Sequence, residues 1–120
     1  MKFSVSMKKN HEFRRLYAKG KSVATPSVVV YCRKTGRDYN QLGLTVSTKV
    51  GNAVCRNKIR RRLREIYRLN EERLEKGYDL VVVARVKGRF VSYQTLEKDV
   101  LFAMGRLGLI SQGTKSGDTK

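Results

Sequence analysis

The residues most suited to chemistry lie between positions 49 and 68, where Lys and Arg dominate the sequence. This segment holds eight cations and one carboxylate, that of Glu65. The cations are Lys49, Arg56, Lys58, Arg60, Arg61, Arg62, Arg64 and Arg68. Like charges four residues apart on a helix, such as Arg56 and Arg60, destabilise it by roughly 0.2–0.5 kcal/mol per pair. The segment therefore favours contact with a regular polyanion, of which the phosphate backbone of a nucleic acid is the commonest.

A helix over this segment has two distinct faces when its residues are placed at about 100° intervals. One face is an apolar stripe that we expect to point to the core: Ile59, Leu63, Ile66 and Tyr67. The other is a contiguous polar face, which we call the basic arc: Arg60, Arg64, Asn57, Arg68 and Arg61. Because arginine suits bidentate contact with phosphate, we predict that the basic arc binds nucleic acid. The alternative is a solvated charged face, the usual role of a run of charges.

Three aromatic residues, Phe13, Tyr17 and Tyr31, have the chemistry to stack on the bases of a single strand. They would do so if the first helix packs beside the first strand and leaves a groove. The alternative is a place in the core, because aromatic residues at helical or strand spacing are commonly buried.

The sequence shows no arrangement of residues for catalysis. His11 is the only histidine, and no acid or nucleophile is evident as its partner. Carboxylates such as Glu71, Glu72 and Glu75 are expected in solvated positions rather than in a pattern for two-metal hydrolysis. We therefore predict no catalytic residue in this chain.

The two cysteines, Cys32 and Cys55, are too far apart for a paired metal-binding motif. With a single histidine, the chain lacks the four ligands of a structural zinc site. We predict free thiols, buried or half-buried, and no metal site.

Length and composition predict one RNA-binding domain over residues 1–110 and a disordered polar tail over 111–120. A formal net charge of +17 points to an anionic partner. A membrane is the main rival to nucleic acid, but no apolar run approaches the ~18 residues of a spanning helix. The N-terminus lacks the apolar stretch of a signal peptide, so we expect a cytoplasmic protein that contacts no membrane.

The elements that must position these residues begin with a short helix over 8–19, which we expect Gly20 to end in the left-handed conformation. Strands are predicted over 27–33 and 42–47, and the turn between them suggests a hairpin. The most apolar run, 78–84, predicts a central strand covered on both faces.

Two helices complete the prediction. Asn52 is expected to cap the long basic helix, and Ser92 to cap a last helix that ends at Gly108. The last helix has an apolar stripe: Leu96, Val100, Ala103, Met104 and Leu107. The order helix, strand, strand, helix, strand, helix indicates an α+β fold, an α/β sandwich of three helices on a mixed four-stranded sheet with one possible extra short strand.

The string GNAVCRNKIRRRLREIYR, residues 51–68, closely resembles the RNR-type signature of the protein subunit of bacterial ribonuclease P. Arg56, Asn57 and Lys58 stand at the RNR positions, and the basic helix continues after them. Three more blocks resemble the family in order and spacing: KKNHEFRRLYAKGKSVATPSVVVY, LGLTVSTKVGNAV and DLVVVARV. The resemblance covers most of the chain, roughly from residue 7 to residue 109.

The resemblance implies an accessory subunit of an endoribonuclease that removes the 5′ leader of precursor tRNA. In this family a large RNA subunit holds the catalytic magnesium ions and performs the hydrolysis, while the protein contacts that RNA and the leader. Pairing of holoenzymes is left open. The resemblance also implies a left-handed βαβ crossover, against the right-handed rule that composition alone would suggest.

Matched positions carry the implied roles of individual residues. Residues that would face the catalytic RNA or its metal-bound phosphates are Arg56, Asn57, Lys58, Arg60, Arg61 and Arg64, to which the basic arc adds Arg68. Residues that would line a cleft for the single-stranded leader are Phe13, Tyr17, Val29 and Tyr31.

Two other functions compete with this interpretation. A ribosomal protein or RNA chaperone would use the same fold for binding alone. A DNA-binding regulator is disfavoured, because strands flank the basic helix and no helix-turn-helix or dimer element is evident.

Overall fold

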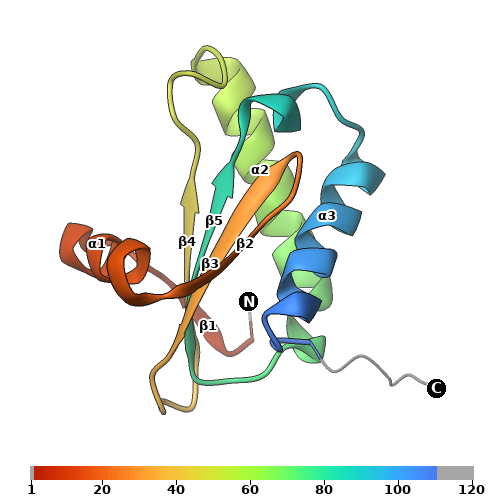
Figure 1. Cartoon of the computed structure of the whole chain (residues 1–120). Helices are drawn as coiled ribbons and strands as arrows, with labels where there is room; N and C mark the ends of the chain where they lie inside the picture. The colour runs from red at the N-terminus through yellow and green to blue at the C-terminus, as the bar shows by residue number, and fades with distance from the viewer. Residues whose placement is uncertain (1, 111–120) are drawn as a thin grey trace.

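The computed structural model describes residues 2–110, which form three α-helices and a mixed five-stranded sheet (Figure 1). The elements in chain order are β1 (Ser4–Ser6), α1 (Asn10–Lys19), β2 (Lys21–Ala24), β3 (Val28–Lys34), β4 (Asn40–Thr45), α2 (Ala53–Asn70), the single turn η1 (Glu71–Arg73), β5 (Tyr78–Ala84), the single turn η2 (Val86–Arg89) and α3 (Tyr93–Arg106). The predicted α+β class is confirmed, with the extra short strand present. The predicted tail, 111–120, lies outside the described residues. None of the helices in the described part of the chain is long and apolar enough to cross a membrane.

The strands lie in the order β1-β4-β5-β3-β2. β4 runs parallel to β1 and β5, whereas β3 runs antiparallel to β5 and β2. The predicted hairpin of β3 with β4 is wrong, because β5 lies between them. β5 is the most apolar strand, and its central place covers both its edges. Most of its residues are buried on both faces, as its sequence predicts, although Val83 is half-buried.

The two edge strands, β1 and β2, are short and carry mostly exposed residues. A short polar strand has no clear alternation of apolar residues, so the sequence offers little signal for it. In the chain, β1 precedes α1, and β2 follows directly after the end of α1.

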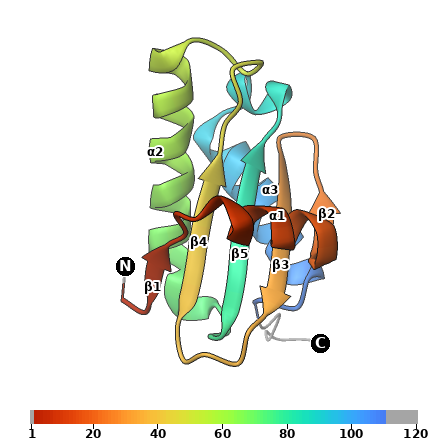
Figure 2. The ribbon, with the colours of Figure 1, turned by 90° about the vertical axis from the view of Figure 1, so that its left-hand side faces the viewer.

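The crossover from β4 through α2 to β5 is left-handed. β4 and β5 are parallel neighbours, and α2 lies on the face of the sheet opposite α1 (Figures 1 and 2). With α2 behind the sheet in Figure 2, β5 stands to the right of β4. The handedness implied by the family resemblance is therefore present.

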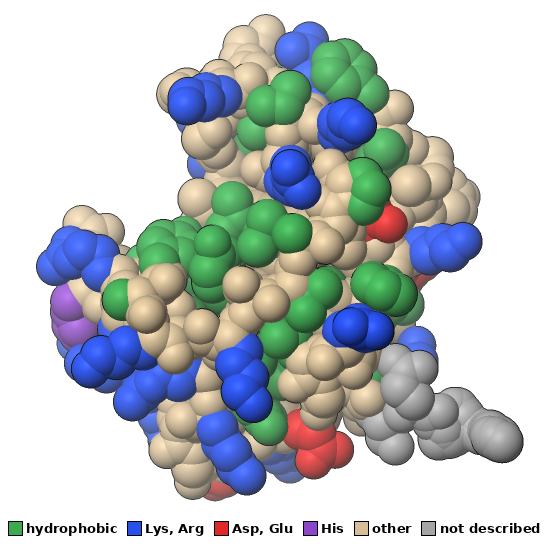
Figure 3. Space-filling model, in the orientation of Figure 1, with side chains coloured by type: hydrophobic (Ala, Val, Ile, Leu, Met, Phe, Trp, Pro, Cys, Tyr) green, Lys and Arg blue, Asp and Glu red, His purple; other side chains and the backbone are tan. Residues whose placement is uncertain are grey.

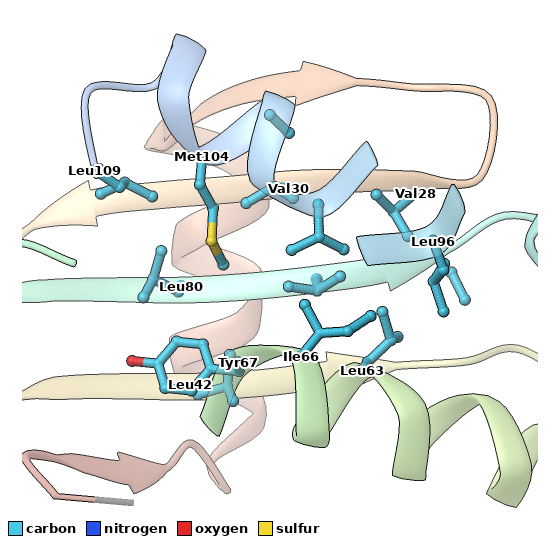
Figure 4. Packing of buried hydrophobic residues seen from close by; sticks show 14 of the residues in the cluster. Val28, Val30, Leu42, Leu63, Ile66, Tyr67, Leu80, Leu96, Met104 and Leu109 are labelled. Atoms are coloured by element: carbon cyan, nitrogen blue, oxygen red, sulfur yellow. The ribbon is translucent and has the colours of Figure 1, made fainter. Parts of the chain in front are cut away.

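The larger part of the core lies between the sheet and the pair α2 and α3. Alternate residues of β3 and β5, such as Val28, Val30 and Leu80, point into it (Figure 4). The predicted inner stripe of α2 is buried in full: Ile59, Leu63, Ile66 and Tyr67. From α3, Leu96, Val100, Ala103 and Met104 are buried as predicted, while Leu107 is half-buried.

The smaller part of the core lies under α1, on the opposite face of the sheet. Leu16 and Met7 pack there with Val81 of β5. α1 has only ten residues, which at ~1.5 Å per residue span about 15 Å. It therefore covers the sheet face in part and leaves the rest of that face open.

Side-chain caps fix the start of both long helices. Asn52 Oδ1 accepts a hydrogen bond from the Cys55 backbone N–H at 2.9 Å, and Ser92 Oγ accepts one from Thr95 at 3.1 Å. Both caps were predicted. Each satisfies a backbone donor that has no partner within its helix.

The two glycines at helix ends differ from each other. Gly108 has φ of 79°, the left-handed conformation. Gly20 has φ of −78°, so its predicted left-handed conformation is wrong. Gly20 allows a close approach of the backbone instead, because a Cβ at this position would lie 2.6 Å from the carbonyl oxygen of Leu16.

Candidate nucleic-acid interface

The basic arc of α2 lies on the solvent side of that helix. Asn57, Arg61, Arg64 and Arg68 are exposed, and Arg60 is half-buried. The inner stripe of α2 faces the sheet, so the two faces separate as the helical spacing predicts.

Two contacts set the direction in which the basic arc points. On one side of α2, the hydroxyl of Tyr67 hydrogen-bonds with Ser4 Oγ of β1 at 2.6 Å and accepts one from Asn40 Nδ2 of β4 at 3.4 Å. On the other side, Arg61 and Arg62 line a surface hollow together with Tyr93 of α3. The arc therefore runs across the outer side of α2, from beside the β1 edge of the sheet to the hollow that Arg61 shares with Tyr93.

The cations of the basic arc differ in how far they are neutralised. Arg68 donates to both carboxylate oxygens of Glu65, at 2.9 and 2.7 Å, and these hydrogen bonds lower the pKa of Glu65. Arg60 Nη1 donates to Asn57 Oδ1 at 3.1 Å, a neutral partner. Among residues 2–110, no ion pair involves Arg60, Arg61 or Arg64. These three charges are available for an anion.

The N-terminal end of α2 adds two further predicted residues. Arg56 Nε donates to the carbonyl oxygen of Gly51 at 3.2 Å, which holds its side chain along the loop before the helix. Lys58 is exposed. Arg56 lies in the first turn of α2, where the helix dipole also favours an anion, and Lys58 lies in the second turn.

The predicted cleft residues come together on the open face of the sheet. The rings of Tyr17 and Tyr31 meet edge to face, with centroids 5.0 Å apart, and Phe13 lies 6.5 Å from Tyr17. The Tyr17 hydroxyl hydrogen-bonds with Thr45 Oγ1 at 3.1 Å. α1 thus joins β3 and β4 through one group of aromatic side chains.

The floor of the cleft is a row of residues across four strands. Thr45 of β4 pairs with Val83 of β5, Val83 pairs with Val29 of β3, and Val29 pairs with Ala24 of β2. None of the four is fully buried. We call Phe13, Tyr17, Tyr31 and this row the aromatic cleft, and Figure 3 shows a hollow with hydrophobic side chains beside the α1 projection.

Three of these floor residues, Thr45, Val83 and Ala24, were not predicted as part of the site. The alternation of β4 and β5 gave a signal for two of them, because Thr45 shares a face with Gly43, and Val83 shares one with Val81. Which face stays open depends on how far α1 extends, and that is a tertiary property.

The aromatic residues of the cleft are partly buried and partly exposed. Phe13 is half-buried and packs on β4, where a Cβ at Gly43 would lie 2.5 Å from its ring. Tyr17 is 41% exposed. Phe13 and Tyr31 therefore act as a wall, and Tyr17 is the ring most open to a base.

The cleft and the basic arc are joined by the chain between them. Thr45 ends β4, and residues 46–52 lead from it to the start of α2. The exposed surface of α1 and of the two residues before it adds more positive charge beside the cleft (Figure 3), from Lys8, Lys9, Arg14, Arg15 and Lys19. Positive charge thus surrounds an apolar and aromatic cleft.

Glu71, which was expected in solvent, is 1% exposed, so that prediction is wrong. Its carboxylate accepts hydrogen bonds from the backbone N–H groups of Lys2 at 2.6 Å and Phe3 at 3.1 Å. Burial acts to raise the pKa of Glu71, but these bonds and one from Ser4 outweigh it and leave the pKa below its usual value. Glu71 therefore fixes the segment that leads into β1 to the end of α2, which is a structural role.

Asp79 of β5 is the second buried carboxylate. Burial raises its pKa, although Arg37, 3.7 Å away, opposes the shift. Among the described residues, no three His, Cys, Asp or Glu side chains are grouped to hold a metal ion. The thiols of Cys32 and Cys55 are free, buried and half-buried respectively, as predicted.

Comparison with known proteins gives consistent matches over nearly the whole chain. A family model described as Ribonuclease P matches residues 1–108. A ribonuclease P protein component of Alkaliphilus oremlandii is 39% identical over 111 residues, which cover 92% of this chain and 97% of the relative. One from Clostridioides difficile is 41% identical over 95 residues, 78% of this chain and 83% of the relative.

Solved structures agree with the sequence relatives. The RNase P protein of Staphylococcus aureus has a TM-score of 0.81 at 33% identity, over 88% of this chain and 96% of that one. The RNase P protein from Thermotoga maritima has a TM-score of 0.75 at 36% identity, over 81% and 92% of the two chains.

Proposed function

This chain belongs to the ribonuclease P protein family, and from that membership we propose how its two surfaces serve the ribonucleoprotein. Membership implies a part in the 5′ processing of tRNA. We propose that the protein binds the catalytic RNA subunit through the basic arc and the single-stranded leader of precursor tRNA through the aromatic cleft. The RNA subunit performs the hydrolysis.

The proposed contact with the RNA subunit is supported by the charges of α2. Arg60, Arg61 and Arg64 have no carboxylate partner among the described residues, and each can neutralise a phosphate. Arg56, Asn57 and Lys58 extend this surface to the start of the helix, and Arg68 extends it to the end. A rigid helix that is capped and packed on the sheet fixes the spacing of these groups.

The proposed leader contact is carried by one observation. Tyr17, 41% exposed, stands edge to face with Tyr31 above an apolar floor that includes Val29 and Val83. An unpaired base can stack on such a ring, whereas a base inside a duplex has no free face to offer. Phe13 forms the wall of the same cleft.

Magnesium is proposed to be held mainly by the RNA subunit. Among the described residues, no three carboxylate, imidazole or thiolate side chains are grouped, and magnesium is usually bound by one or two carboxylates together with phosphates, which here the RNA would supply. We propose that the cations of the protein assist by lowering the repulsion between the RNA subunit and precursor tRNA, so that fewer metal ions are needed for the two to associate.

Reconstitution tests the proposal. The protein, added to its cognate RNA subunit at low magnesium, should raise the rate of precursor-tRNA cleavage. A variant with Arg60→Gln, Arg61→Gln and Arg64→Gln should lose most of this effect, while Lys34→Gln, on an exposed strand end, should keep it. No enhancement by the wild-type protein would contradict the proposal, and co-purification with ribosomal RNA instead would favour a purely RNA-binding role.

A further inference from the structure

The outer surface of α3 carries an aromatic side chain between two cations. Lys98, Phe102 and Arg106 follow one another at four-residue spacing, so they lie along one face of the helix. At ~1.5 Å per residue, the two cations are about 12 Å apart along the axis, with the ring midway. The ring of Phe102 is 56% exposed.

These residues line a surface hollow that Arg73 of η1 and Leu101 and Ile110 also line. Every charged residue of the hollow is a cation. Leu101 is half-buried and Ile110 is buried, so the apolar surface on offer is mainly the one phenylalanine ring. We call this hollow the α3 platform.

The ring of Phe102 differs from the other strongly exposed phenylalanine. Phe90 is 73% exposed, but the guanidinium of Arg89 lies over its ring, 5.4 Å from the centroid. Within residues 2–110, no cation lies over the ring of Phe102. One aromatic face therefore stays free, with cations around it rather than on it.

We propose that the α3 platform binds an unpaired nucleotide of an RNA strand. The base stacks on Phe102, and the flanking phosphates lie against Lys98, Arg106 and Arg73. An acidic amphipathic helix would also match the charge, but it needs a long apolar groove, and the platform offers one flat ring. Because α3 lies on the opposite face of the sheet from α1 (Figures 1 and 2), this site is separate from the aromatic cleft.

Tryptophan fluorescence tests the proposal, because the natural chain has no tryptophan. Phe102→Trp places a single reporter on the platform and keeps an aromatic face. Tyr39→Trp is the control: Tyr39 is 36% exposed, belongs to neither proposed RNA surface, and has the guanidinium of Arg37 over its ring, 5.4 Å from the centroid. Each full-length variant is titrated with a short single-stranded RNA while binding anywhere on the protein is followed by anisotropy.

The proposal expects saturable quenching of the tryptophan at 102 and little change at 39. Lys98→Gln and Arg106→Gln in the Phe102→Trp chain should each weaken this local binding and reduce its log–log salt slope by about 0.7. Replacing the RNA with one that lacks bases at several positions should weaken quenching about fivefold or more, since stacking would be lost.

Three results would overturn the proposal. Emission at 102 that stays constant while anisotropy reports bound RNA would show that nucleotides bind elsewhere. Equal quenching by the base-free strand or by an acidic peptide would show charge binding without stacking. Quenching that occurs only after deletion of residues 111–120 would show that the chain's own end occupies the platform.

Discussion

The basic arc and the aromatic cleft lie in different layers of the same small protein and offer RNA different chemistry. The arc presents cations on a helix whose inner side is fixed in the core, and most of these cations have no carboxylate partner within residues 2–110. The cleft presents rings and small apolar side chains on a sheet face that α1 covers only in part. On the proposed assignment, the arc would suit any regular phosphate backbone, whereas the cleft would take an unpaired base.

This difference separates affinity from discrimination. Contacts of the arc with phosphates release counterions, so they should depend steeply on salt and little on whether the bound RNA has a leader. Stacking in the cleft should depend weakly on salt and distinguish precursor tRNA from mature tRNA. The following substitutions test whether the two surfaces divide the work in this way.

The largest effect is expected from Leu63→Ala, which removes a buried contact beneath the basic arc. A cavity at this 2% exposed position should lower the free energy of unfolding by about 2–5 kcal/mol, measured by urea denaturation. Arg64→Ala, one residue further along the same helix, should change it by less than about 0.5 kcal/mol. Equal losses at both positions would contradict the division of α2 into a structural face and a binding face.

Glu71→Gln should have the next largest effect. Loss of charge at this buried carboxylate weakens its hydrogen bonds to the N-terminal segment and should cost about 1.5–3 kcal/mol at neutral pH. Because the folded pKa lies below the ordinary 4.5, the wild-type advantage is full above that value and is lost as pH falls through the folded pKa.

Asp79→Asn is the matched control for that pH dependence. The folded pKa of Asp79 is raised, so ionisation destabilises the folded state as pH rises from the ordinary 3.8 through the folded value. Relative to wild type, Asp79→Asn should therefore become more stable over that range, the opposite trend to Glu71→Gln. Parallel pH curves for the two variants would refute these assignments.

Tyr17→Ala should weaken binding of precursor tRNA by about 1–3 kcal/mol while leaving mature tRNA nearly unchanged. Tyr17→Phe keeps the ring and removes only the hydrogen bond to Thr45, so most of the discrimination should remain. The measurement is the ratio of the two dissociation constants in the reconstituted holoenzyme. Equal losses for both RNAs would mean that Tyr17 supports the fold rather than the leader.

The smallest effects concern single charges of the basic arc. Arg64→Ala should reduce the log–log salt slope of RNA-subunit binding by about 0.7–0.9. Arg68→Ala should reduce it less, because Glu65 already neutralises that arginine. Glu65→Gln should steepen the slope, because Arg68 would then have no carboxylate partner at position 65. An unchanged slope in all three variants would show that the arc is a solvated face that does not bind the RNA subunit.

The sequence predicted α2 in detail because every feature of that helix is local. Its inner stripe, its outer arc and its Asn52 cap all follow from spacing along one segment. The place of β5 between β3 and β4 could not be predicted in the same way, since strand pairing joins residues that are far apart in the chain. The turn between β3 and β4 suggested a hairpin because a turn is a local signal, and it does not show that β5 lies between the two strands.

The candidate site shows the same limit. The aromatic residues were identified from their type and from the family resemblance, but which of them stays open depends on where α1 crosses the sheet. Glu71 was expected in solvent because its neighbours in the sequence are polar, whereas its hydrogen-bond donors, Lys2 and Phe3, lie near the N-terminus of the chain. Long-range contacts, rather than residue type, decide exposure at both places.

Site-specific crosslinking tests the division between the two surfaces most directly. A photoreactive amino acid placed at Tyr17 in one variant and at Arg64 in another is irradiated in the holoenzyme bound to precursor tRNA. We expect position 17 to crosslink to leader nucleotides and position 64 to crosslink to the RNA subunit. Crosslinks from position 64 to the leader, or from position 17 to the RNA subunit alone, would contradict the account.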